Sequence, residues 1–80
     1  MRARVIIRLK PGVLDPQGAA VEGALHSLGF GAASNVRVQK LIELDVDAAD
    51  AAGAKAQVEA MADRLLRNPV IEDCSVEVLP

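Results

Sequence analysis

The 80-residue sequence is nearly devoid of aromatic residues, with no tryptophan, no tyrosine and a single phenylalanine. Proteins that bind single-stranded nucleic acid stack bases on aromatic rings, and nucleic-acid-binding domains carry basic patches. The formal net charge of this chain is −2 at pH 7. The shortage of rings and of positive charge therefore argues against nucleic acid as a partner.

Cysteine and histidine each occur once, as Cys74 and His26. One cysteine excludes an intrachain disulfide and a cysteine-ligated zinc site within one chain, and it favours a reducing compartment. Cys74 is expected to be a small core residue, and His26 to form a solvated pair with Glu22, four residues earlier on a helix. We therefore expect no catalytic site, bound cofactor or metal site built from this chain alone.

Long apolar runs are also absent, since no stretch approaches the 18 or more residues that cross a bilayer. The N-terminal sequence MRARVIIRLK lacks the apolar region and the cleavage site of a secretory signal. These absences predict that the chain does not enter a membrane and that it is cytoplasmic.

Small apolar residues dominate what is present: 51% of the chain is hydrophobic, but fourteen of these residues are alanine. A single domain covering residues 1–80 buries only about 60% of the surface of its unfolded chain. Such a small core favours association with further chains. We expect a homodimer or a dimer of dimers.

Apolar periodicity predicts the elements in the order β-α-β-α-β. Residues 2–10 alternate as a strand that ends at Pro11–Gly12. Asp15 caps a helix that begins with Pro16 and stops at Gly29. A second helix begins near residue 49 or 50 and ends before Asn68–Pro69, and a last strand covers about 71–79. This order predicts a two-layer α+β sandwich with both helices on one face of the sheet.

The middle strand, residues 35–47, is long and has a break in its pattern. Lys40 falls on its apolar face and Leu41 on its polar face. A two-residue hairpin at this point would turn Glu43 and Asp45 into the core, so we expect a continuous strand with a bulge or bend. Each half of it could pair with a different neighbour, in the same chain or in another copy. Periodicity leaves the strand directions open.

Four stretches, VLDPQG, ALHSLGF, VRVQKLIELDV and NPVIED, resemble the small PurS-type accessory subunit of phosphoribosylformylglycinamidine (FGAM) synthase. The resemblance covers nearly the whole chain and implies a ferredoxin-like, largely antiparallel sheet. One departure is Gln39, which precedes Lys40 where the family commonly has glycine.

The resemblance also implies a function in de novo purine biosynthesis. In that multi-subunit ligase a glutaminase subunit releases ammonia, and a large ATP-dependent synthetase subunit transfers it to formylglycinamide ribonucleotide. The small subunit bridges the two and supports ammonia transfer, while the complex uses ATP, Mg²⁺ and glutamine.

Seven residues are candidates for contacts with partner chains. Lys40 is expected to reach a partner where the long strand leaves its own core, although its stem could instead carry the ammonium past the sheet edge into water. Apolar spots on an otherwise charged sheet face, and positions within the family motifs, supply the other candidates: Arg37, Leu41, Ile6, Asp15, Gln17 and Asn68. For Asp15, Gln17 and Asn68, capping alone is an alternative role.

Other classes of function remain open on the sequence. ACT-like regulatory modules bind amino acids at dimer interfaces through a glycine-bearing turn after the first strand, which Pro11–Gly12 weakly resembles. Saturable amino-acid binding in equilibrium dialysis would favour that alternative.

Overall fold

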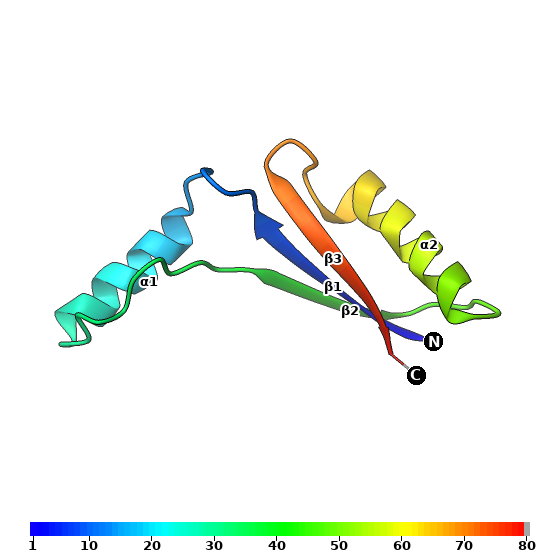
Figure 1. Cartoon of the computed structure of the whole chain (residues 1–80), viewed down its shortest axis with the longest axis horizontal. Coiled ribbons are helices and arrows are strands. Elements are labelled where there is room, and N and C mark those ends of the chain that lie inside the picture. The colour runs from blue at the N-terminus through cyan, green and yellow to red at the C-terminus, as the bar shows by residue number, and fades with distance from the viewer. Residues whose placement is uncertain (80) are drawn as a thin grey trace.

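Figure 1 shows the computed structural model of the chain, which describes residues 1–79. The elements follow the predicted order: β1 (Arg2–Leu9), α1 (Pro16–Ser27), β2 (Lys40–Asp45), α2 (Ala51–Met61), a π-helical turn η1 (Ala62–Leu66) and β3 (Glu72–Leu79). Asp15 caps α1 as expected from the sequence, and α2 begins close to the predicted residues 49 and 50. The side chain of Asp15 accepts the N–H of Gly18, and that of Asp50 accepts the N–H of Gly53.

The three strands form a sheet in the order β2-β1-β3, and both outer strands run antiparallel to β1. This confirms the antiparallel arrangement that the family resemblance implied. The core lies between one face of this sheet and α2, which lies alongside β3 (Figure 1). Its buried apolar residues are Ala3, Val5, Ile7, Val46, Ala54, Val58 and Ala62.

Helix α2 buries a stripe with four-residue spacing. Ala54, Val58 and Ala62 are fully buried, and Leu66 continues the stripe through the π-helical turn. Leu65, next to this stripe, is 83% exposed. The alanines allow close approach of helix and sheet, but they contribute little apolar area, so the core stays small.

Helix α1 does not cover the sheet. It lies beyond one end of it (Figure 1), so the prediction that both helices cover one face holds for α2 alone. A helix packs back over a sheet when it connects parallel strands. Here β2 is antiparallel to β1 and begins opposite Ile7, at the end where β1 stops. The connection that contains α1 therefore leaves the sheet and returns to the same end of it. As a result the molecule is elongated and measures 50 × 27 × 14 Å.

The predicted long strand is paired only over its second half. The register Ile6–Leu41 and Ile7–Lys40 continues without interruption into the rest of β2, so there is no bulge at Lys40. The first half, residues 36–39, is extended but runs along α1 instead of along a strand. It begins after Asn35, whose φ of 53° turns the chain.

We call α1 together with residues 36–39 the arm. Two carboxylates, and not a neighbouring strand, accept backbone N–H groups of residues 36–39. Asp15 accepts the N–H of Val38 at 2.8 Å, and Glu22 accepts that of Val36 at 3.2 Å. Gly18 packs against the carbonyl oxygen of Val36, where a Cβ atom would overlap it. The arm is therefore a connected unit, although apolar residues in and beside it are largely exposed: Leu14 78%, Val21 43%, Leu28 74% and Phe30 60%.

Candidate functional site

A cleft of about 310 Å³ lies where the arm meets the sheet. It is formed by the start of α1, the start of β2 and the first residue of β3. Three of the predicted contact residues, Asp15, Gln17 and Lys40, meet there. The other lining residues are Ile7, Leu9, Pro16, Val38 and Glu72.

Asp15 holds this junction together. Its side chain is the one polar side chain among the buried residues of the described chain, with the residue 7% exposed. One carboxylate oxygen accepts the N–H of Gly18 and the other that of Val38, both at 2.8 Å. These two bonds, that from Gly18 first, lower the pKa of Asp15 below 3.8; desolvation opposes the shift and the positive charge of Arg37 adds to it.

Asp15→Asn is expected to destabilise the chain in a pH-dependent way. Because the pKa of Asp15 is lower in the folded chain than its ordinary value of 3.8, its ionisation stabilises the fold above pH 3.8. That contribution is lost as the pH falls through the lower folded value. Urea unfolding of both proteins between pH 6 and pH 2.5 should show a difference that shrinks below pH 3.8. A difference that stays constant over this range would contradict the role of the charge.

Lys40 does lie on the core face, opposite Ile7, as the alternation predicted. Its side chain is 70% exposed, because α2 does not extend over this end of the sheet, and its Nζ lies 4.0 Å from Oε2 of Glu72. The Glu72 side chain is only 14% exposed, and its other oxygen accepts the N–H of Asn68 at 2.7 Å. Within one chain Lys40 therefore neutralises a shielded carboxylate, and its contact with a partner stays a prediction.

The remaining candidates lie apart from the cleft. Arg37 donates from Nη1 to the carbonyl oxygen of Val13 at 2.8 Å. Asn68 uses its side-chain oxygen to accept the N–H of Val70 at 3.0 Å, which is a turn-capping role. Leu41, 56% exposed, faces Ile6 in the register, and they share the sheet face that α2 leaves uncovered.

Charged rows flank this apolar pair on the uncovered face. Arg2 lies 3.3 Å from Asp45, while Arg4 lies 3.9 Å from Glu43 and 3.8 Å from Glu77. The basic row of the central strand thus pairs with acidic rows on both sides. Exposed pairs of this kind stabilise a fold by about 0–1 kcal/mol each, so their main effect is to set which strands can lie next to each other.

The role of Glu22 differs from the predicted one. It was expected to pair with His26, but it bonds Val36 instead, and Nε2 of His26 lies 2.7 Å from the carbonyl oxygen of Ala33. Asp15 and Glu22 are seven residues apart, two helical turns, which places both carboxylates on one face of α1. That spacing was the signal available in the sequence.

Among residues 1–79 no helix is both long and apolar enough to cross a membrane.

Comparison with known proteins places this chain in a family. Residues 2–80 match PurS, described as phosphoribosylformylglycinamidine (FGAM) synthase. The chain is 45% identical over 75 residues to phosphoribosylformylglycinamidine synthase subunit PurS of Synechocystis sp., covering 94% of this chain and 75% of the relative. It is 42% identical over 77 residues to the same subunit of Bacillus subtilis, covering 96% of this chain and 90% of the relative.

Solved structures agree in fold over nearly the whole chain. The crystal structure of Methanocaldococcus jannaschii PurS superposes with a TM-score of 0.87 at 39% identity, covering 95% of this chain and 92% of that one. A Bacillus subtilis PurS structure gives 0.87 at 40% identity, with 99% and 98% covered. The antiparallel sheet, the β-α-β-α-β order and the matched sequence together show that the chain belongs to the PurS family of FGAM synthase subunits, which act in purine biosynthesis.

Proposed function

We propose that this chain is a non-catalytic bridging subunit of FGAM synthase. It joins the glutaminase subunit to the large ATP-dependent synthetase subunit and supports ammonia transfer between them in the cytoplasm. ATP, Mg²⁺ and glutamine are bound by those other subunits. The observation that carries the proposal is that much of the chain's apolar and hydrogen-bonding surface, above all the arm and the outer edge of β2, has no partner among residues 1–79.

Protection of ammonia is the physical reason for such a bridge. Free ammonia is protonated at neutral pH, and the ammonium ion is not a nucleophile. A dry junction between subunits prevents this loss during transfer. A subunit that contributes contact surfaces and no reacting groups is suited to form it.

The outer edge of β2 supports pairing with a second copy. Met1 and Val46 exchange both backbone hydrogen bonds, each at 2.8 Å. Bonded and non-bonded pairs alternate along an antiparallel ladder, so Leu41, Glu43 and Asp45 direct their N–H and C=O groups away from β1. Together with residues 36–39 this edge offers a long unpaired strand.

The side chains along this edge are complementary to themselves. If two copies pair antiparallel about Leu41, that residue meets its own copy and Arg37 meets Asp45 of the other chain. On the opposite face, Val38 meets Leu44. The arm of each copy then covers the half-buried inner face of the other copy's β2. The arrangement uses the exposed apolar residues of the arm and is the homodimer that we propose.

Reconstitution tests the bridging function. The glutaminase and synthetase subunits are mixed with and without this chain and assayed with glutamine and, separately, with an ammonium salt. We expect glutamine-dependent synthesis to fall at least about tenfold without the chain, while synthesis from abundant ammonia is unchanged. Equal rates from glutamine with and without the chain would refute the proposal.

A further inference from the structure

The sheet has a second free edge, on β3. Lys10 donates its N–H to the carbonyl oxygen of Ile71 at 2.8 Å. Together with the register of β1 and β3, this bond shows which residues of β3 hydrogen-bond to β1 and which do not. By alternation, Glu72, Cys74 and Val76 point their backbone groups away from β1. Those of Glu72 are already used, because its N–H bonds the carbonyl oxygen of Asn68 and its C=O accepts from Arg67. Those of Cys74 and Val76 face the free edge.

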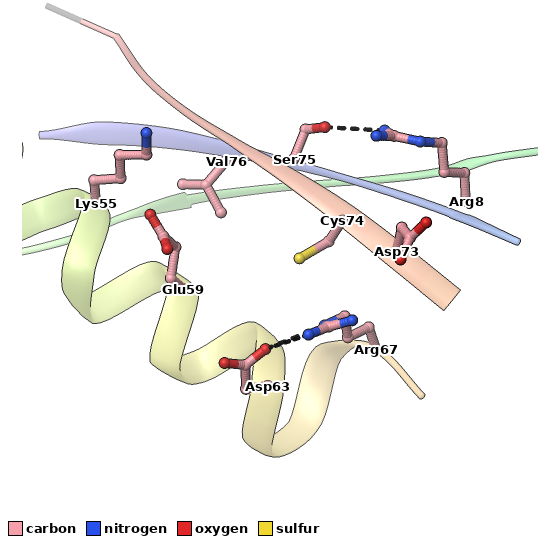
Figure 2. A pocket seen from close by; sticks show the side chains of 9 residues that line it. All are labelled: Arg8, Lys55, Glu59, Asp63, Arg67, Asp73, Cys74, Ser75 and Val76. Carbon is pink, nitrogen blue, oxygen red and sulfur yellow. Dashed lines mark hydrogen bonds and ion pairs between the residues drawn. The ribbon is translucent and has the colours of Figure 1, made fainter. Parts of the chain in front are cut away.

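A groove of about 600 Å³ runs along this edge. Four consecutive residues, 73–76, line it, and Arg8 of β1, which bonds to Ser75, also contributes to the lining (Figure 2). Successive side chains of a strand point to opposite faces, so a cavity lined by all four lies along the edge and not on one face. The opposite wall is a row with four-residue spacing on α2 and the turn after it: Lys55, Glu59, Asp63 and Arg67 (Figure 2). An extended chain could occupy this groove and hydrogen-bond to β3.

The charge along β3 argues against a second copy as the occupant. On the uncovered sheet face its side chains are Asp73, Ser75, Glu77 and Leu79. Because this row has no cation, no antiparallel register of two β3 strands places a positive charge opposite either acid. Like charges facing each other across strands are destabilising. This distinguishes the β3 edge from the β2 edge, whose row contains Arg37 as well as acids.

β1, which pairs with the other edge of β3, shows which side chains lie next to the acidic row within this chain. In the register of β1, Arg8 lies opposite Asp73 and Arg4 opposite Glu77. Arg4 reaches Glu77 at 3.8 Å, whereas Arg8 donates to the hydroxyl of Ser75 at 2.9 Å. Asp73 makes no ion pair within residues 1–79, and the Glu77 side chain is still 58% exposed. Both acids therefore have capacity for a second basic neighbour.

We propose that the free edge of β3 binds an extended strand of another FGAM synthase subunit, with arginine or lysine at alternate positions facing Asp73 and Glu77. Main-chain hydrogen bonds to Cys74 and Val76 supply affinity, and the acidic row selects the strand. The inference rests on the proposed bridging function and names the chemistry of the partner segment. It assigns the two edges different tasks: β2 pairs with its own copy and β3 with a different chain.

Hydrogen exchange in the complete complex tests the main-chain part. The amides of Cys74 and Val76 should exchange rapidly in the isolated chain and slow at least about tenfold once the other two subunits are added. The amides of Asp73 and Ser75, which point to β1, serve as the internal control. Unchanged exchange at Cys74 and Val76 in the assembled complex would overturn the proposal.

Two variants test the edge and the charge separately. Val76→Pro removes the outward N–H without breaking a bond to β1, and the double variant Asp73→Lys, Glu77→Lys reverses the row. Both variants should keep the homodimer and remain folded at the assay temperature, while affinity for one partner subunit falls at least about tenfold. Their unfolding temperatures should fall, because the lysines lie opposite Arg8 and Arg4 and because the Val76 side chain packs against the core. The matched double variant Asp73→Asn, Glu77→Gln should bind the partner subunit with an affinity between that of the wild-type chain and that of the double lysine variant.

The outcomes separate this inference from the bridging function. If the wild-type chain assembles with its partners and supports glutamine-dependent synthesis, but both variants do so equally well, the β3 inference alone is refuted. If the wild-type chain fails to assemble with either subunit, the bridging function itself is refuted.

Discussion

Glu43→Pro is expected to convert the homodimer into a monomer that remains folded. Proline has no N–H, and the N–H of Glu43 points to the outer edge of β2, so no bond to β1 is lost. Proline is tolerated at such edge positions. Across a symmetric interface the substitution removes two hydrogen bonds, each contributing roughly 1 kcal/mol, and places a ring in each strand's path. The dimer dissociation constant should rise at least about hundredfold in sedimentation equilibrium.

Two controls isolate the backbone effect in this experiment. Glu43→Gln removes the charge, including the ion pairs with Arg2 and Arg4, but keeps the N–H, and it should remain dimeric. Val76→Pro places the same residue on the opposite edge and should also remain dimeric. A dimeric Glu43→Pro variant would refute self-association through β2 and leave the arm without its proposed cover.

Gly18→Ala is expected to destabilise the chain although alanine is the better helix former. In α1 the substitution should gain about 1 kcal/mol from helix propensity. The added Cβ, however, would overlap the carbonyl oxygen of Val36. A backbone atom cannot move aside as a side chain does, so the arm must separate. Overpacking of this kind costs about 1–3 kcal/mol, and the net free energy of unfolding should fall, as measured by urea denaturation.

Gly23→Ala supplies the matched control on the same helix. A Cβ at Gly23 would meet no atom within 4 Å, so only the propensity gain of up to about 1 kcal/mol applies. The two substitutions should therefore change stability in opposite directions. Equal stabilisation by both would show that α1 does not pack against residues 36–39 in solution.

Local signals in the sequence predicted the local structure well. Asp15 caps α1, Gly29 ends that helix with a φ of 95°, and the alternation placed Lys40 on the core face. Each of these depends on interactions within a few residues, which a single sequence displays directly. The four family motifs are likewise continuous stretches of chain, so they were sufficient to indicate the PurS family.

The position of α1 and the true length of the middle strand depended on strand direction, which periodicity does not report. The apolar stripe of α1 resembles that of a helix packed on its own sheet, and residues 36–39 resemble the first half of a paired strand. Only the antiparallel return from β1 to β2 showed that both leave the sheet.

The sequence alone determined the element order, the cap of the first helix, the family and which residues are apolar on each face. The tertiary structure decided which of those faces this chain covers itself, which it leaves open, and which backbone groups point to a free edge. The reason is physical: burial favours covering an apolar face whatever molecule provides the cover, so a pattern of hydrophobicity does not distinguish a residue's own chain from a partner.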